Sequence, residues 1–337
     1  MASISVRDVA ARAGVSVGTV SNVLNRPEQV SAETVERVQQ VIAELGFVRN
    51  DAARQLRAGS SRAVGLIVLD ISNPFFSDLA RGAQQAADEN GSVILLGNSD
   101  QAPAREASYL DLFEEQRVRG VLISPVGEVE ARLTRLRHRG IGAVLVDHRI
   151  PGSGFSSVSV DDVSGGELAV SHLIELGRRR IAFVGGPFAL HQVADRLDGA
   201  QRAIAAAKGA ATLEVIGVES LTILDGRAAG DRIVARDPRD RPDAIFAAND
   251  LVALGLVQSF VMGSGLRIPE EIAIVGYDDI GFASSAVVPI SSIRQPSEAI
   301  GRTAITMLAD EIAGREAAGR DVVFQPELVI RASTSPR

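Results

Sequence analysis

The feature that most constrains this 337-residue chain is an alternation of apolar runs and amphipathic stretches that begins near residue 63. Near-continuous apolar runs predict buried strands, and apolar residues at helical spacing predict helices between them. Strands alternating with helices are typical of parallel α/β sheets. The runs cover residues 64–69, 93–96, 120–124, 143–146, 181–184, 244–247 and 272–275, and the helical stretches include 76–89, 165–176, 196–207 and 250–262.

The length of this α/β region predicts more than one sheet. About 275 residues follow residue 62, which is long for a single sheet of this class. We therefore expect two lobes. There is no repeat of short period, so a solenoid is excluded.

The first segment, before residue 63, has a different residue pattern, which predicts three short helices. Ser5, Ser16 and Ser31 fit the N-caps of these helices, and Asp8 follows Ser5 at the spacing of a capping box. Gly14 fits a tight turn after the first helix, and a glycine also closes the third. Residues 47–62 are polar and end in Gly-Ser-Ser, so we interpret them as a linker. So small a helical unit has little core of its own.

Several function classes are excluded by what the sequence lacks. The chain has no cysteine, which removes disulfides, thiolate nucleophiles and Cys-ligated metals. Its single lysine does not follow a glycine as a P-loop requires, and its four histidines lack metal-ligand spacing. We expect no catalytic residues, no metal and no cofactor. No 18-residue apolar run and no secretory signal occur, so we expect a cytoplasmic protein without a membrane contact.

The charge of the chain is unevenly distributed. The net charge is −7, but residues 1–62 hold eight arginines against six acids. The first segment is therefore +2 and the remainder −9. A basic head on an acidic body allows contact with nucleic acid through the head alone.

Polar residues follow the predicted strands and indicate a ligand cleft. Asp70, Asp147, Asn249 and Asp278 each come where an apolar run ends. Ligands of open parallel sheets bind at the carboxyl ends of the strands, where such side chains can hydrogen-bond a polyol. The alternative is that these residues cap the following helices, and for Asp250 the two interpretations are equally supported.

Residues 8–25 resemble the helix-turn-helix of the lactose-repressor (LacI/GalR) family of bacterial regulators. The resembling residues are Asp8-Val9-Ala10-Ala11-Arg12-Ala13-Gly14-Val15-Ser16 and Thr19-Val20-Ser21-Asn22-Val23-Leu24-Asn25. The resemblance continues in Val30-Ser31, Leu45-Gly46-Phe47, Asn50-Asp51-Ala52-Ala53-Arg54-Gln55-Leu56, Asn73-Pro74-Phe75-Phe76, Gly276-Tyr277-Asp278-Asp279 and Gln295-Pro296.

The resemblance implies an α/β fold of three parts. Residues 1–46 would form an all-α helix-turn-helix domain, 47–62 a hinge with a short helix, and 63–337 a two-lobed core of doubly wound parallel sheets, similar to periplasmic binding proteins. The N-lobe would cover about 63–160 and 291–322, and the C-lobe about 161–290 and 323–337. The chain would cross between the lobes near 160, 290 and 323.

The resemblance also implies which residues contact DNA. Val17, Gly18 and Asn22 match positions that read bases, although Val17 alone could simply pack. Asn22 stands where many relatives have arginine, and since Asn prefers adenine and Arg guanine, the operator preference stays open. The full set is Ser5, Ser16, Val17, Gly18, Thr19, Ser21, Asn22, Asn25 and Ser31 in the helices, and Asn50, Ala53, Arg54, Leu56 and Arg57 in the hinge.

Leu56 matches the hinge leucine that relatives insert into the minor groove, where an apolar wedge unstacks a base step. The alternative is that Leu56 packs against its dimer mate. Leu56→Ala is expected to weaken binding to a DNA duplex selected on the wild-type chain, with effector binding unchanged. An unchanged DNA affinity, measured by fluorescence anisotropy, would exclude the wedge.

The resemblance places an effector between the lobes. Phe75 and Phe76 match residues that stack on the ligand, and Arg196 and Asp278 match charged contacts. Leu190 stands where a purine-responsive relative has a polar contact, which favours a sugar over a purine or nucleoside. The complete set is Phe75, Phe76, Asp147, Arg196, Asn249, Asp278 and Gln295.

We therefore predict a transcriptional regulator, most simply a repressor, that binds a palindromic operator in double-stranded DNA as a homodimer. Both inducers and corepressors occur on this scaffold. A solute-binding protein would need an export signal and would have no use for residues 1–62. An enzyme would need a nucleophile or an acid–base pair in the cleft. Loss of operator binding on deletion of residues 1–62, with ligand binding retained, would distinguish the regulator from both.

Overall fold

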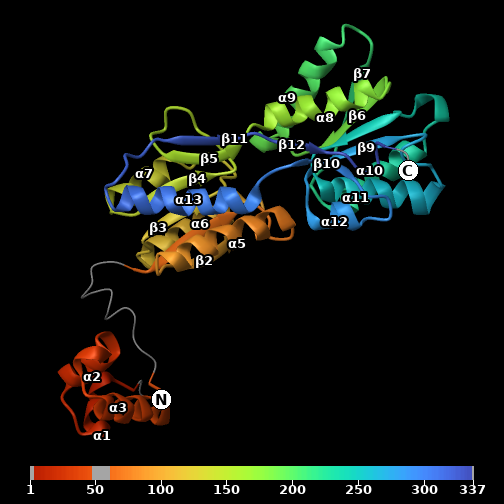
Figure 1. Ribbon diagram of the computed structural model, residues 1–337. Coiled ribbons are helices and arrows are strands. Elements are labelled where there is room, and N and C mark those ends of the chain that lie inside the picture. Colours follow the sequence, from red (N-terminus) through yellow and green to blue (C-terminus); the bar gives the residue numbers. More distant parts are fainter. Residues whose placement is uncertain (1–3, 48–60, 336–337) are drawn as a thin grey trace. The chain divides into compact units, whose positions relative to one another are not determined.

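The computed structural model describes residues 4–47 and 61–335 and divides into two compact units, residues 1–60 and 61–337. We call the first unit the head and the second the core. Figure 1 shows the head as helices only and the core as two sheets with helices around them. No helix in the described part of the chain is long and apolar enough to cross a membrane.

The head is a three-helix unit whose ends are set by the predicted caps. The Ser5 backbone N–H donates to Asp8 Oδ2 at 2.7 Å, and Ser16 Oγ accepts the Thr19 N–H at 3.0 Å. Gly14 ends the first helix with φ +68°, a left-handed conformation that favours glycine. The elements are α1 (Val6–Ala13), α2 (Val17–Asn25), η1 (Pro27–Gln29) and α3 (Ala32–Leu45).

The third predicted cap differs in its hydrogen bond. Ser31 precedes α3, but its hydroxyl donates to Thr34 Oγ1 at 2.9 Å and does not cap a backbone N–H. Val9, Val20 and Val38 are fully buried at the centre of the head. This small apolar cluster is the core on which the head depends.

The N-lobe is a six-stranded parallel sheet with the order β11-β5-β4-β3-β1-β2. Leu66 on β1 pairs with Leu96 on β2 and Leu122 on β3. Helices α5 and α13 contact β2, β4 and β5, and α6 and α7 contact β1 and β4. The elements are β1 (Ala63–Val68), α5 (Pro74–Glu89), β2 (Val93–Asn98), α6 (Pro103–Glu115), β3 (Gly120–Ile123), α7 (Glu130–His138), β4 (Gly142–Val146), β5 (Ser156–Val160), α13 (Ser297–Ile312) and β11 (Asp321–Phe324).

The C-lobe repeats this topology with the order β12-β10-β9-β8-β6-β7, and only β12 runs antiparallel to its neighbour. The repeat places a second set of strand ends opposite the first. The elements are α8 (Asp162–Glu175), β6 (Arg180–Gly185), α9 (His191–Ala206), β7 (Thr212–Gly217), α10 (Ile223–Val234), η2 (Pro238–Asp240), β8 (Ala244–Ala247), α11 (Asp250–Gln258), η3 (Ser259–Ser264), β9 (Ala273–Asp278), α12 (Gly281–Ser285), β10 (Ser291–Arg294) and β12 (Glu327–Val329).

The chain passes between the lobes three times (Figure 1). The first passage follows β5, close to the expected position 160. The second lies between β10 and α13 and not at 290, because residues 291–294 pair with β9 in the C-lobe sheet. The third lies between β11 and β12, so residues 323–324 belong to the N-lobe sheet. Both differences arise because β10 and β11 are short strands, four residues each, and neither has a long apolar run.

Three helix pairs of the core pack backbone against backbone at glycines. A Cβ on Gly301 of α13 would lie 2.0 Å from Leu79 O of α5, and one on Gly199 of α9 would lie 1.9 Å from Val163 O of α8. A Cβ on Gly255 of α11 would lie 2.1 Å from Ile223 O of α10. Glycine lets each pair approach more closely than side chains permit.

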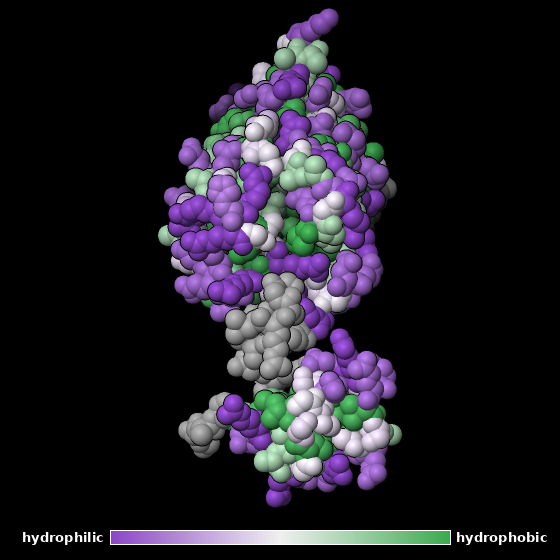
Figure 2. All heavy atoms as spheres, turned by 90° about the vertical axis from the view of Figure 1, so that its left-hand side faces the viewer, coloured by the Kyte–Doolittle hydropathy of each residue, from purple (hydrophilic) through white to green (hydrophobic). Residues whose placement is uncertain are grey.

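The surface of the core is mostly polar on the face that Figure 2 shows, with hydrophobic residues interspersed among hydrophilic ones. The largest apolar cluster includes residues of both sheets, and a second cluster lies in the N-lobe alone. The central strands β3, β4, β6, β8 and β9 are almost wholly buried. These strands hold their carboxyl ends, and the loops that follow, in fixed positions.

Candidate functional site

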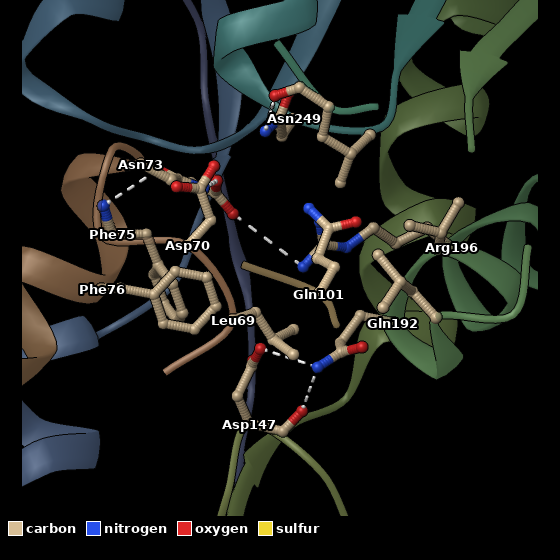
Figure 3. Close-up of a pocket in the computed structure, with 14 residues that line it drawn as sticks. Leu69, Asp70, Asn73, Phe75, Phe76, Gln101, Asp147, Gln192, Arg196 and Asn249 are labelled. Atoms are coloured by element: carbon tan, nitrogen blue, oxygen red, sulfur yellow. Dashed lines mark hydrogen bonds and ion pairs between the residues drawn. The ribbon is translucent and has the colours of Figure 1, made fainter. Parts of the chain in front are cut away.

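A pocket of about 470 Å³, open to solvent, lies between the two lobes of the core. Its walls come from the ends of β1, β2 and β4 in the N-lobe and of β6, β8 and β9 in the C-lobe (Figure 3). The lining residues are Leu69, Asp70, Asn73, Phe75, Phe76, Gln101, Asp147, Leu190, Gln192, Val193, Arg196, Leu221, Asn249 and Asp278.

Arg196 of α9 is the only arginine of this lining and it is almost fully buried. Its Nε donates to Asp162 Oδ1 at 2.8 Å, and its Nη1 donates to Ala248 O at 2.7 Å. Its Nη2 lies 3.9 Å from Asp278 Oδ1, and its guanidinium carbon lies 3.7 Å from the ring centroid of Tyr277. Three charged or aromatic partners thus fix one guanidinium at the base of the pocket.

The electrostatics around Arg196 combine burial with opposite charge. Burial alone would lower the pKa of the Arg196 guanidinium, but the nearby carboxylates of Asp162 and Asp278 raise it above its usual range. Burial raises the pKa of the Tyr277 hydroxyl, because burial disfavours the charged form of either group. Arg196 is therefore a permanent cation whose partners are acidic.

Asp147 follows β4 and has a left-handed backbone conformation, with φ +58°. Gln192 Nε2 of the C-lobe donates to Asp147 Oδ2 and to its carbonyl oxygen, both at 2.8 Å. Burial and then the charge of Asp162 raise the pKa of the Asp147 carboxyl. Its other oxygen, Oδ1, is buried and has no hydrogen-bond partner among the described residues. The pocket thus contains an acceptor that a bound molecule can satisfy.

Asp278 ends β9 and receives hydrogen bonds from the N-lobe and from the connection that follows β10. Asn73 Nδ2 donates to its Oδ2 at 2.9 Å, and Gln295 Nε2 donates to its Oδ1 at 2.8 Å. Burial raises the pKa of Asp278. Gln295 is not among the residues that line the pocket and its amide orients Asp278, so its role in effector binding stays a prediction.

Phe75 and Phe76 lie at the start of α5, where Asn73 accepts the Phe75 N–H at 3.0 Å and caps the helix. Their rings meet edge to face, with centroids 5.0 Å apart. Both residues line the pocket (Figure 3). They give one wall an apolar aromatic surface opposite the buried charges.

Asn249 both caps a helix and lines the pocket, the two roles that were left open for polar residues at strand ends. Its Oδ1 accepts the Val252 N–H at 2.9 Å and caps α11, and its Nδ2 donates to Leu221 O at 3.2 Å. The residue also lines the pocket. Asp250 is fully buried, and its carboxylate accepts from Ser292 Oγ at 2.7 Å and from the Ile280 N–H at 2.9 Å.

Sequence reasoning did not include Asp162, Tyr277 and Gln101 in the site. Asp162 begins α8 directly after β5, where a polar residue at a strand end was the available signal. Gln101 follows β2 with φ +54° and lines the pocket. Tyr277 follows the apolar residues of β9, and its position does not distinguish it from a core residue. No three metal-ligating side chains gather within the residues the structure describes.

Helix α2 of the head exposes the residues expected to read bases. Val17, Gly18 and Asn22 are exposed, and Val17 is 40% exposed and lies outside the apolar cluster of the head. Ser16 Oγ also contacts Thr19 Oγ1 at 2.9 Å. Val17 therefore does not pack in the core of the isolated head, which was the alternative role.

The remaining predicted contacts of the head differ in exposure. Ser5, Ser31 and Asn25 are exposed, and Ser21 is half-buried. Asn25 Nδ2 donates to Ser21 O at 2.8 Å. The hinge residues Asn50, Ala53, Arg54, Leu56 and Arg57 lie outside the described residues.

The positive charge of the first 62 residues is concentrated at their end. Residues 4–47 contain four arginines and five acids, whereas residues 48–62 contain four arginines and one acid. The helical part of the head is thus not itself basic.

Comparison with known proteins gives two family matches. Residues 5–50 match the model of bacterial regulatory proteins of the lacI family, and residues 170–334 match a periplasmic binding protein-like domain. The HTH-type transcriptional repressor PurR of Aliivibrio fischeri (strain ATCC 700601 / ES114) is 31% identical over 334 residues, which cover 99% of both chains.

Two solved structures extend these similarities. The transcriptional regulator CelR in complex with cellobiose is 32% identical, with a TM-score of 0.72 over 98% of this chain and 99% of the other. The lac repressor dimer bound to operator and the anti-inducer ONPF is 26% identical, with a TM-score of 0.82 over 99% of each chain. Both comparisons include the head as well as the core.

Proposed function

The chain belongs to the lacI family of bacterial regulatory proteins and is a DNA-binding transcriptional repressor regulated by a small-molecule effector, and we propose that this effector is a sugar bound between the lobes. The observation that carries this proposal is the buried, unpartnered Oδ1 of Asp147, a residue that lines the same pocket as Phe75 and Phe76. A sugar hydroxyl donates to such an oxygen, while the C–H face of the ring packs on Phe75 and Phe76. The similar CelR structure contains cellobiose.

The charge of the pocket narrows the class of sugar. The lining carries three carboxylates, Asp70, Asp147 and Asp278, against the single guanidinium of Arg196. Asp162 adds a fourth carboxylate on the far side of Arg196. This excess of acids disfavours phosphorylated or carboxylated effectors, because a buried anion would face like charges. We therefore propose an uncharged sugar.

A purine or nucleoside is the second candidate. The relatives named PurR support it, as do the two phenylalanines, because flat rings stack on aromatic faces. Leu190 supports the sugar instead, since its apolar side chain offers a heterocycle no hydrogen bond. The panel described below distinguishes the two.

We propose that effector binding acts by linkage. The effector contacts both lobes, so it favours the lobe arrangement that it binds better, and this arrangement changes operator affinity. An inducer favours the arrangement that binds operator worse, and a corepressor the one that binds it better. The measured change in DNA affinity on effector addition assigns the sign.

For DNA recognition we propose that the N-terminal turn of α2 enters the major groove. Val17, Gly18 and Asn22 are the exposed residues that reach bases, and Ser16 and Thr19 hold phosphates through hydroxyls and backbone N–H groups. The arginines of residues 48–62 supply the charge that the helical part of the head lacks. Because operator DNA is cytoplasmic, we place the protein there, and we assign it no catalyzed reaction.

We propose a homodimer on a palindromic operator. Large hydrophobic side chains are exposed on one group of contacting C-lobe elements, namely Leu224 of α10, Met262 of η3 and Phe282 of α12, at 77%, 79% and 59%. Apolar side chains exposed to this degree are typical of protein interfaces. The similar lac repressor structure is a dimer.

Thermal melting against monosaccharides, disaccharides, sugar phosphates, nucleosides and purines tests the effector. A neutral sugar at 100 times its dissociation constant should stabilise the protein by about 2.7 kcal/mol, and the phosphorylated form should not. Asp147→Asn should weaken binding of that sugar at least ten-fold, because an amide accepts hydroxyls less strongly than a carboxylate. Asp198→Asn, an exposed change on α9, is the matched control.

Each outcome of the panel is decisive. A shift with a purine or nucleoside alone would replace the sugar by the second candidate. A panel without any shift would remove both effector classes while DNA binding stands. Equal affinity in Asp147→Asn and wild type would remove Asp147 from the site.

A further inference from the structure

Two histidines from opposite lobes stack on one another beside the effector pocket. His148 follows β4 in the N-lobe, and His191 begins α9 in the C-lobe. Their ring centroids are 4.4 Å apart and their planes differ by 18°. The neighbouring pair, Asp147 and Gln192, is joined by the 2.8 Å hydrogen bonds described above. Two consecutive residues of each lobe thus form contacts that depend on the relative position of the lobes.

The two rings have different environments. His148 is half-buried, and burial together with the nearby His191 lowers the pKa of the His148 imidazole to about 4. His191 is exposed and occupies the first position of α9. The stack therefore favours a neutral His148 ring.

The charged groups around the pair do not neutralise a proton on His148. On the β4 side, Asp147 is turned toward Gln192, and Arg149 lies 3.8 Å from Asp321 of β11. On α9, Asp195 faces His191, and Arg196 is paired with Asp162. The loop from β6 to α9, residues 186–190, carries no charged residue.

The geometry of the stack excludes a shared metal ion. An imidazole binds a metal through a ring nitrogen, with the metal near the plane of the ring. Two nearly parallel planes separated as these are cannot both contain one ion. Proton uptake is the chemistry that remains for the pair, because imidazole changes charge between pH 5 and 8.

We propose that the His148–His191 stack is a pH-sensitive contact between the lobes, and that protonation of His148 favours lobe arrangements in which the stack is broken. A charged His148 gains water when the lobes move apart, and it separates from any proton on His191. The inference concerns the core alone and holds for any effector. Because the pocket lies between the same lobes, acid conditions change the affinity for whatever binds there.

The direction of the pH effect follows from the linkage between proton binding at His148 and the arrangement of the lobes. His148 binds a proton less readily in the stacked arrangement than in an arrangement where it is hydrated, for which its ordinary pKa is about 6.5. The stacked arrangement therefore loses stability as pH falls from about 6.5 toward 4, and keeps it above that window. Between pH 7.5 and 5.5 the ratio of the two arrangements should shift roughly ten-fold.

A double-label distance measurement tests the proposal directly. The chain contains no cysteine, so Ala131→Cys on α7 and Ala205→Cys on α9 give one label on an exposed position of each lobe. Pulsed EPR on the full chain, diluted into excess unlabelled chain, reads distances within one molecule. The distance distribution should shift between pH 7.5 and 5.5.

Two variants separate the stack from other pH effects. His148→Phe keeps a ring over His191 but binds no proton, so its distance distribution should not change with pH. His138→Gln removes an exposed histidine at the end of α7 and should keep the wild-type response. The proposal is overturned by a wild-type distribution that does not change with pH, or by His148→Phe changing as much as wild type.

An NMR titration provides a second test that needs no variant of the stack. The chain has only four histidines, so their ring signals can be followed in the intact protein. While the lobes keep the arrangement described here, the His148 ring should titrate well below the ordinary range of a histidine. Titration of His148 at the ordinary value, with an unchanged distance distribution, would show that the stack does not oppose protonation and would contradict the proposal.

Discussion

Replacing Arg196 with methionine should destabilise the core by roughly 3–5 kcal/mol and abolish effector binding. Methionine is similar in length but carries no charge, so the change removes the partner of Asp162 and the cation nearest to Asp278. It also removes the donor to Ala248 O and the cation above the Tyr277 ring. The acids that remain are then buried without a counterion. An uncompensated buried charge is the reason that removing one partner of a buried ion pair is strongly destabilising.

Urea unfolding of wild type, Arg196→Met and Arg202→Met measures this effect. Arg202 lies on the same helix and pairs with Asp198, but both side chains are about half exposed, so its replacement should cost less than about 1 kcal/mol. The difference in unfolding free energy between wild type and Arg196→Met should become smaller as pH falls from 7.5 to 5.5. The buried carboxyls then have a pKa above that of the unfolded chain, so the folded variant binds more protons and gains relative stability in acid. An unfolding midpoint equal to wild type would show that the acids do not depend on Arg196.

Changing Val20 to aspartate should abolish DNA binding and leave the core intact. Val20 is fully buried between α2 and the rest of the head, and an unpaired carboxylate there costs several kcal/mol. The head contains only a small apolar cluster, so it has little stability to lose. Because the head and the core are separate compact units, the melting of the core and its effector affinity should stay unchanged.

Anisotropy with a duplex selected on the wild-type chain measures the loss of DNA binding. Gln39→Ala is the control, because Gln39 is exposed on α3, outside the residues proposed to contact DNA, and its truncation leaves the head folded. That variant should keep the wild-type affinity. Retention of wild-type affinity in Val20→Asp would mean that α2 does not need its packed position to bind DNA.

The local features of the chain could be predicted from sequence because short-range chemistry determines them. The Ser16 hydroxyl caps α2 by accepting the N–H of Thr19, three residues further on. Gly14 ends α1 in a left-handed conformation, a local feature that depends only on the residues next to it. Four polar residues at strand ends were placed in the pocket correctly, since parallel strands bring their carboxyl ends to one edge. They are Asp70, Asp147, Asn249 and Asp278, whereas Phe75 and Phe76 came from the family resemblance.

What escaped prediction depends on contacts between distant residues. Asp162 lies 34 positions before Arg196, and no local pattern indicates that they pair. Gln295 follows a strand as the other site residues do, but its strand is β10, and its amide donates to Asp278. The burial of Tyr277 against the guanidinium requires Gly165, whose missing Cβ would lie 2.2 Å from the hydroxyl oxygen.

The glycine contacts between paired helices determine where the repressor can bend. In α5 with α13, α8 with α9 and α10 with α11, backbone rests on backbone at these glycines, and no side chain lies between the two helices at those points. Each lobe is therefore mechanically stiff, and a strain imposed at the pocket is not absorbed within a lobe. This strain is transmitted to the three short connections that join the lobes, and these connections act as the hinge of the core. Substitutions in those connections should change how far a bound effector moves one lobe against the other, with little effect on how tightly either lobe is folded.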